Sequence, residues 1–167
     1  MKNKITPIIL FDGQAEEAAQ FYVRLMPDSQ IDEVKRWPAD KAGGSPGEVL
    51  TVKFTFGGFQ FVALNGPKFP FTEAVSFQIA CADQAEVDRL WAALSAGGTE
   101  GPCGWLKDRW GLSWQVTPTR LFGLIADPDP DRARRAIEAM MKMSQINISE
   151  VEHAANSLQT IQPEITQ

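Results

Sequence analysis

Three tryptophans are the side chains in this sequence best suited to binding a small molecule. Trp105, Trp110 and Trp114 fall within ten residues, on two expected strands and the turn between them. Aromatic rings so placed could form the wall of a cup against which a planar or apolar ligand stacks. They could equally fill a core, which is the commoner use of aromatic residues in strands. Both interpretations remain open.

Two amides could supply the polar contacts of such a cup. Gln78 interrupts the otherwise apolar stretch Val75–Cys81, and a buried amide must bond either a backbone group or a polar ligand. Gln115 has the same two roles open to it. Because side chains alternate along a strand, at most one of Trp114 and Gln115 points into the cup.

Two further residues complete the candidates. Asn65 stands before Gly66, and this pair is typical of a turn. A turn is therefore the favoured role of Asn65, and a pocket role is the alternative. Cys103 is expected to be more exposed than Cys81. The two cysteines are 22 residues apart without a CxxC motif, which favours separate reduced thiols over a redox or zinc pair. The candidate pocket residues are therefore Gln78, Trp105, Trp114, Gln115, Asn65 and Cys103.

The sequence offers no set of residues for nucleophilic catalysis. Its one histidine, His153, lies in the C-terminal segment, remote in sequence from the expected strands. Neither a Ser–His–Asp nor a Cys–His arrangement is therefore indicated. The run Lys107-Asp108-Arg109 is interpreted most simply as a solvated hairpin turn.

The composition is that of a folded globular protein. Of the 167 residues, 44% are hydrophobic and 22% are charged. The net charge of −5 argues against binding to nucleic acid, which needs a basic surface. No run of about 18 apolar residues occurs, so no membrane-spanning helix is expected. The short apolar run near the N-terminus fits a strand better than a signal peptide, and we therefore expect a cytoplasmic protein.

The first half of the chain has the pattern of a strand, a helix and three more strands. Ile5–Phe11 is apolar and β-branched, and helical spacing begins after Gln14 and ends at Pro27-Asp28. Three strands are then expected, the last two joined by the tight turn Gly57-Gly58: Ser29–Trp37, Val49–Phe56 and Phe59–Leu64.

The second half repeats this order. Val75–Cys81 reads as a strand, and Asp83 with Glu86 forms a helix start that resembles a capping box. The apolar stripe of the helix that follows consists of Val87, Leu90, Trp91 and Leu94. Short strands are expected at Gly101–Lys107 and Leu112–Val116.

The two halves also share identical residues at corresponding positions. At an offset of 70 residues, Gln14-Ala15-Glu16 coincides with Gln84-Ala85-Glu86, which indicates a duplication. We therefore predict a single α+β domain with two βαβββ modules, residues 1–66 and 67–118, that form curled mixed or antiparallel sheets. Residues 119–167 form a C-terminal helical tail, with one helix starting near Asp127 and a second capped by Ser149. The apolar stripe of the tail predicts dimer or subdomain contacts.

Four runs of residues carry a resemblance to a known family. They are FDGQAEEAAQFY at 11–22, ALNGP at 63–67, GWLKDRWGLSWQVTP at 104–118 and DPDPDRARRAIEAMMKM at 127–143. Together they resemble the PhnB-like branch of the glyoxalase/bleomycin-resistance (vicinal oxygen chelate) superfamily, over roughly residues 4 to 155. Proteins of this branch often carry the name demethylubiquinone methyltransferase. The resemblance implies the paired βαβββ fold and a homodimer.

The resemblance also implies positions for a divalent metal ion. Superfamily enzymes hold it with His, Gln or Glu from the first and last strands of each half. The corresponding positions here are Pro7 or Thr6, Phe77 or Ser76, one of residues 62–64, and Gln115. Only Gln115 is a ligand of the required type, and one glutamine cannot hold a divalent ion alone. We therefore expect no metal site of the family type and no cofactor.

These observations favour a metal-independent protein that binds a small molecule in the sheet cup or in a dimer cleft. A metal-dependent lyase, isomerase or dioxygenase-type enzyme is an alternative, which only Gln115 favours. The methyltransferase of the family label is a third. It would need a glycine-rich strand-to-helix turn, whereas the glycine doublets at 43–44, 57–58 and 97–98 lie elsewhere. Whether the protein is an enzyme stays open.

Overall fold

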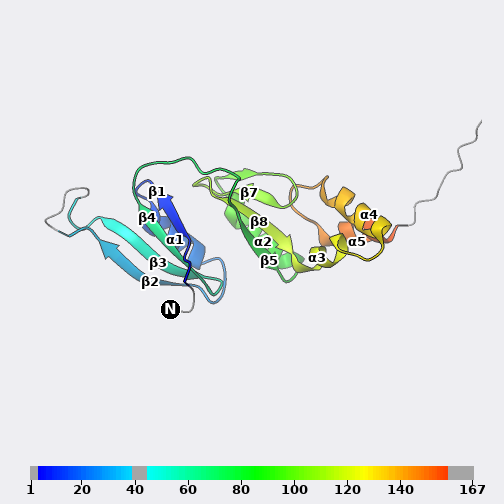
Figure 1. Cartoon of the computed structure of the whole chain (residues 1–167), viewed down its shortest axis with the longest axis horizontal. Coiled ribbons are helices and arrows are strands. Elements are labelled where there is room, and N and C mark those ends of the chain that lie inside the picture. The colour runs from blue at the N-terminus through cyan, green and yellow to red at the C-terminus, as the bar shows by residue number, and fades with distance from the viewer. Residues whose placement is uncertain (1–3, 39–44, 158–167) are drawn as a thin grey trace, which may run out of the picture. The chain divides into compact units, whose positions relative to one another are not determined.

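The computed structural model describes residues 4–38 and 45–157, which form two compact units (Figure 1). The first unit ends at Phe71 and the second begins at Thr72, and each is described by itself below. The division falls five residues after the predicted module boundary at residue 66, and the C-terminal helices belong to the second unit.

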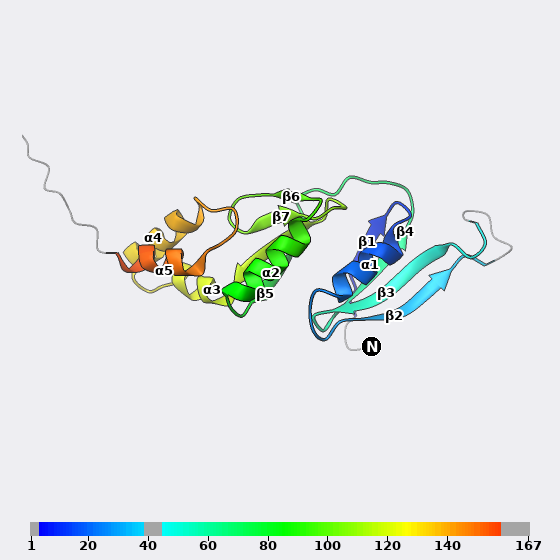
Figure 2. The same cartoon turned by 180° about the vertical axis from the view of Figure 1, so that it is seen from behind.

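The first unit is a four-stranded sheet with one helix on its face (Figure 2). Its elements are β1 (Ile8–Phe11), α1 (Ala15–Val23), β2 (Gln30–Arg36), β3 (Val49–Phe56) and β4 (Phe59–Asn65). The strand order is β1-β4-β3-β2, with β1 parallel to β4 and the other pairs antiparallel. Small side chains on α1 let the helix lie close to the strands, and Tyr22 stacks on Phe54 at 6.1 Å between ring centroids.

The second unit repeats this topology. Its sheet contains β5 (Phe77–Cys81), β6 (Thr99–Glu100), β7 (Trp105–Lys107) and β8 (Ser113–Pro118), and its helix is α2 (Gln84–Ser95). The order is β5-β8-β7-β6, and β5 again runs parallel to the strand that is last in the chain, β8. The expected helix start is confirmed, because the Asp83 carboxylate accepts from the Glu86 amide at 2.9 Å and Glu86 accepts from the Ala82 amide at 2.7 Å. The predicted α+β fold of two βαβββ modules is therefore confirmed.

Three short elements differ from the sequence prediction. The strand expected at Gly101–Lys107 starts only at Trp105, because Cys103 and Gly104 have φ angles of 57° and 82° that interrupt extended backbone. The two-residue strand β6 and the helix α3 (Thr119–Ile125) were not predicted. In α3 a central glycine, Gly123, hides the helical pattern.

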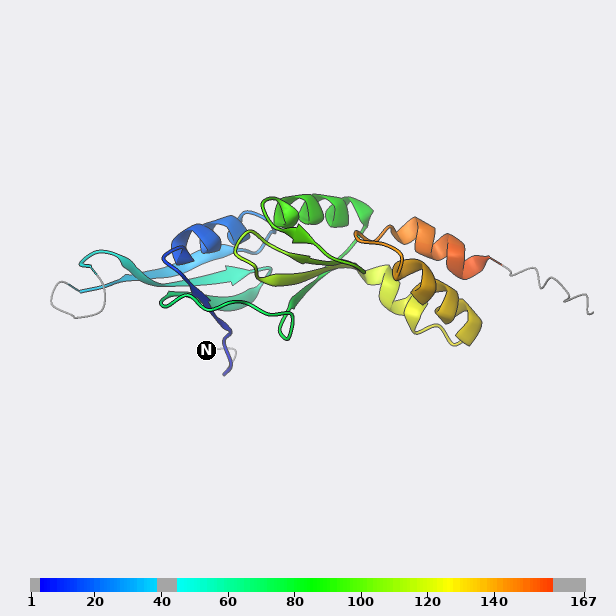
Figure 3. The same ribbon diagram turned by 90° about the horizontal axis from the view of Figure 1, so that it is seen from above.

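The C-terminal helices form a small cluster of their own. It contains α3, α4 (Pro130–Met140) and α5 (Ile148–Asn156), coloured yellow to red in Figure 3. We call these three helices, with the loops between them, the helical cluster. Asn147, not the predicted Ser149, caps α5, because its side-chain oxygen accepts from the amides of Ser149 and Glu150. The buried side chains of the helical cluster are Leu121, Leu124, Ala136, Ile146, Val151 and Ala155.

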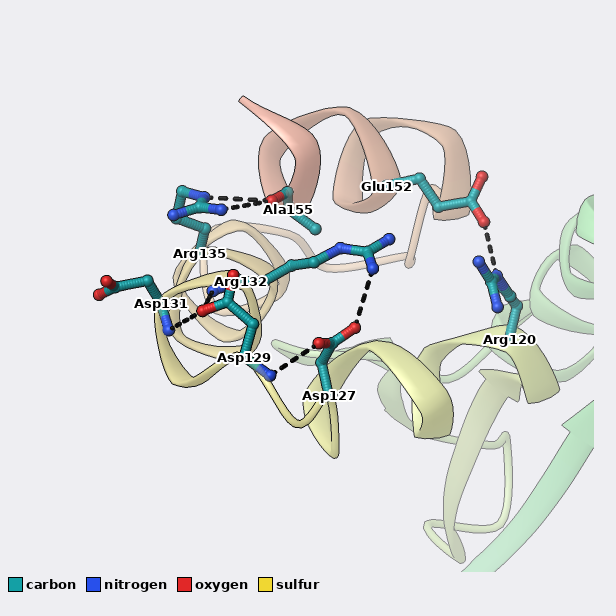
Figure 4. Close-up of polar contacts among 8 residues, drawn as sticks. All are labelled: Arg120, Asp127, Asp129, Asp131, Arg132, Arg135, Glu152 and Ala155. Carbon is teal, nitrogen blue, oxygen red and sulfur yellow. Dashed lines mark hydrogen bonds and ion pairs between the residues drawn. The ribbon is translucent and has the colours of Figure 1, made fainter. Parts of the chain in front are cut away.

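Polar contacts join the helices of this cluster (Figure 4). Arg120 of α3 bonds Glu152 of α5 at 2.8 Å, and the Arg135 guanidinium donates to the Ala155 carbonyl at 2.8 and 3.1 Å. The second contact places a positive charge at the carboxyl end of α5, where the helix dipole favours it. Among the described residues, no helix combines the length and the apolar composition needed to cross a membrane.

Candidate functional site

One face of the second sheet is covered by α2, and the opposite face carries polar and aromatic side chains. We call the latter the open face. The strand register places Gln78 opposite Gln115, Gln115 opposite Trp105, and Lys107 opposite Ser113. Because side chains alternate along a strand, these residues share the open face, whereas their neighbours Ile79, Leu106 and Val116 are buried on the other face.

A pocket of about 480 Å³ lies at the β6–β7 side of the open face. This volume is within the range of sites that hold small organic ligands. Its principal side chains come from neighbouring strands, so the sheet fixes their spacing. The lining residues are Glu73, Thr99, Glu100, Gly101, Pro102, Trp105, Leu106, Lys107 and Ser113.

The pocket combines an aromatic wall with two hydrogen-bond donors. The half-buried indole of Trp105 provides the wall. Lys107 forms an ion pair with Glu73, and the hydrogen bond from Lys107 lowers the pKa of the Glu73 carboxyl. Ser113 is 1% exposed, and its hydroxyl has no hydrogen-bond partner in the described residues. A buried hydroxyl without a partner is costly, so a molecule that bonded Ser113 would remove this cost.

The structure brings three of the predicted candidates to one face. Trp105 lines the pocket, and Gln115 and Gln78 lie beside it on the open face. Both amides have protein partners, since Gln115 donates to the Ser76 hydroxyl at 2.8 Å and Gln78 donates to that of Thr117 at 3.4 Å. They shape the surface next to the pocket without lining it.

Trp114 and Asn65 lie elsewhere. Trp114 is 2% exposed on the α2 face of the sheet, where its ring packs 5.6 Å from that of Phe77. Asn65 ends β4 in the first unit, where its side-chain oxygen accepts from the Ala15 amide and its nitrogen donates to the Val49 carbonyl. These bonds tie together α1, β3 and β4. Asn65 also borders a groove of about 820 Å³ in that unit, together with Trp37.

Asp108 is a residue that the sequence interpretation placed wrongly. It was expected in a solvated turn, but it is 2% exposed. Its carboxylate accepts from the amides of Trp110 and Leu112 at 2.9 and 3.1 Å and from the indole nitrogen of Trp114 at 2.8 Å. The bond to Trp110 closes an Asx-turn, for which an aspartate three residues before Gly111 is a recognisable signal. Asp108 thus fixes the turn between two pocket residues, Lys107 and Ser113.

The two cysteines occupy different environments. Cys81 is buried under α2, and burial raises the pKa of its thiol to about 12. Cys103 is half-buried in the loop before β7, and its amide donates to the Met143 carbonyl at 2.7 Å. Its side chain does not line the pocket.

We expect iodoacetamide at about pH 8 to label Cys103 in the folded protein and to spare Cys81, because the thiolate is the reactive form. Mass spectrometry of the folded chain should show one adduct, and a Cys103→Ser variant should show none until urea is added. Two adducts in the folded wild type would contradict the burial of Cys81.

The donors at the positions implied for a divalent metal do not suit such an ion. Gln115 donates its amide hydrogen to Ser76, and the ring of Phe77 packs against Trp114. The first-unit positions offer a threonine hydroxyl and apolar side chains. Within residues 4–38 and 45–157, no three His, Cys, Asp or Glu side chains lie close enough to hold a metal. A set of neutral oxygens with no carboxylate or imidazole is a poor fit for a divalent cation.

Comparisons with known proteins agree with this architecture. The family model described as 3-demethylubiquinone-9 3-methyltransferase matches residues 3–117. A PhnB protein from Bacillus cereus is 33% identical, with a TM-score of 0.61 over 70% of this chain and 99% of its own. No curated protein matches the sequence.

Two more distant structures show the fold alone. A protein from Pseudomonas aeruginosa is 20% identical, with a TM-score of 0.59 over 70% of this chain and 97% of its own. The fosfomycin resistance protein FosX from Listeria monocytogenes is 9% identical, with a TM-score of 0.50 over 71% of this chain and 92% of its own. The family match ends at residue 117, before the helical cluster begins at Thr119.

Proposed function

This chain belongs to the 3-demethylubiquinone-9 3-methyltransferase family, the PhnB-like branch of the glyoxalase/bleomycin-resistance superfamily, and we propose that it binds a small molecule without a metal ion. The binding site is the pocket on the open face of the second sheet. The observation that carries this proposal is Ser113, a buried residue that lines the pocket and whose hydroxyl has no partner in the described residues.

Two features support a partly aromatic ligand. The wall provided by Trp105 offers a flat apolar surface, and ring stacking favours planar ligands. The pocket volume of about 480 Å³ admits a two-ring molecule. The donor set described above gives a metal-dependent mechanism no support beyond Gln115.

Methyl transfer, which the family description names, finds little support in the turns of this chain. The turn between β1 and α1 contains a single glycine, Gly13, and the turn between β5 and α2 contains none. A nucleotide-like cofactor is usually held by several glycines that let the backbone approach it. Binding is therefore a better account of the pocket than transfer of a methyl group.

We also propose that the protein is a cytoplasmic homodimer. Ile8 is 65% exposed on the face of the first sheet that α1 leaves open, beside the half-buried Leu10, Val62 and Leu64. An apolar surface of this kind favours a partner. The two free cysteines suit a reducing compartment. Light scattering during gel filtration would test the dimer by giving its mass.

A neutral two-ring probe tests the pocket. We expect naphthalene-2-methanol to bind the wild type in calorimetry, and Trp105→Ala to weaken that binding about tenfold, because stacking and apolar burial are lost. Trp37→Ala is the matched control, since Trp37 is also half-buried but borders the groove of the first unit. Equal losses in both variants, or no saturable binding to the wild type, would contradict the proposal.

A further inference from the structure

Three pocket side chains are arranged to hold two different parts of one ligand. Lys107 and Ser113 are directly opposite each other on β7 and β8, so their side chains start about 5 Å apart on the open face. Trp105 lies two residues before Lys107 on the same strand, about 7 Å away on the same face. A ring stacked on Trp105 therefore presents a substituent to the ammonium and the hydroxyl together.

The present partner of Lys107 is easily exchanged. Glu73 lies in the turn before β5, outside the sheet, and its side chain is 62% exposed. The Lys107 side chain is 38% exposed. Ion pairs between exposed side chains contribute little to stability, because water and salt screen them. A ligand carboxylate that forms a charge-assisted hydrogen bond with Lys107 can therefore replace Glu73 at small cost.

The buried serine adds the second contact. The Ser113 hydroxyl can donate one hydrogen bond, and it has no acceptor in the described residues. A carboxylate has two oxygens, so one can accept from Lys107 and the other from Ser113. A neutral alcohol or amide could satisfy Ser113 but would leave the ammonium with Glu73.

We propose that the ligand is an aromatic monoanion, an inference that rests on the proposed function. Its ring stacks on Trp105, and its carboxylate displaces Glu73 from Lys107 and accepts a hydrogen bond from Ser113. Glu73 in this arrangement occupies the anion position while the pocket is empty. The pocket therefore selects for charge as well as for shape.

Two probes that differ only in charge test this inference by calorimetry. We expect naphthalene-2-carboxylate to bind the wild type at least tenfold more tightly than naphthalene-2-methanol. Lys107→Met should abolish that preference, and Lys53→Met, on the first sheet, is the matched control that should keep it. Ser113→Ala should weaken the carboxylate severalfold. Glu73→Gln should strengthen it severalfold, because the competing carboxylate is gone.

The outcomes separate the two proposals. Equal affinity for both probes, or an unchanged preference in Lys107→Met, overturns the anion inference and leaves the pocket intact. Weaker carboxylate binding in Glu73→Gln also overturns the inference, because it makes Glu73 a support for Lys107 and not a competitor. If neither probe binds the wild type, the proposed function is contradicted, and the anion inference is contradicted as well.

Discussion

Replacing Asp108 with alanine is expected to destabilise the second unit by about 4 kcal/mol or more. The carboxylate accepts from two backbone amides and from the indole of Trp114, and all of these donors lose their acceptor in the variant. Each buried donor left unsatisfied costs about 1–3 kcal/mol. Asp108→Asn keeps one acceptor oxygen, so its cost should be smaller, about 2 kcal/mol. Urea unfolding, monitored by tryptophan fluorescence, measures the loss of stability in both variants.

Asp88 provides the control for this experiment. It lies in the same unit and also accepts two side-chain hydrogen bonds, from Gln84 and Gln145, but it is exposed. Asp88→Asn should therefore cost no more than about 1 kcal/mol, since water replaces the lost partner. If Asp108→Ala were as mild as Asp88→Asn, the carboxylate would not be what fixes the turn, and the spacing of Lys107 and Ser113 would need another cause.

The fold was predictable from the sequence because its two modules obey simple periodicities. Every member of the predicted stripe of α2 is buried: Val87, Leu90, Trp91 and Leu94. The repeated topology could be predicted because the second half of the sequence repeats the strand and helix pattern of the first, and the two sheets have the same strand order. These features depend on local alternation, which the sequence displays directly.

The site was less predictable because it depends on strand register. The sequence singles out Trp105 because aromatic residues are conspicuous, but it predicts a solvated turn at Lys107 and gives no signal for Ser113. The left-handed residues Cys103 and Gly104 shorten the strand before Trp105, and no periodicity reveals where it starts. The same uncertainty left Trp114 and Gln115 as alternatives, and the register places Gln115 on the open face.

The helical cluster is hydrogen-bonded to the second sheet through the loop that precedes β7, and part of this loop lines the pocket. The amides of Cys103 and Gly104 donate to the carbonyls of Met143 and Ser144, both at 2.7 Å. Met143 and Ser144 lie between α4 and α5, so the loop connects pocket residues 101, 102 and 105 to the helices. Although the cluster lies outside the family match, it supports one side of the candidate site.

Gly104→Ala tests that connection and should destabilise the second unit by about 3 kcal/mol. Gly104 has a φ of 82°, which a side chain disfavours. An added Cβ would lie 2.8 Å from the Cδ1 methyl of Ile146 and 2.9 Å from the Val116 carbonyl oxygen. Thermal unfolding of the variant measures the loss. Gly123→Ala is the control, since a Cβ there meets nothing within 4 Å.

A second substitution separates the two causes of this loss. Ile146→Val removes the methyl that the new Cβ would strike, and by itself it should cost about 1 kcal/mol. If Ile146 of the helical cluster holds the loop in place, the effects of the two substitutions are not additive. The double variant, Gly104→Ala with Ile146→Val, should then lose about 1 kcal/mol less stability than the two single losses added together. The remaining loss then belongs to the strained φ and to the Val116 carbonyl. Strict additivity would mean that Ile146 moves aside freely, and the cluster would then not set the position of the pocket loop.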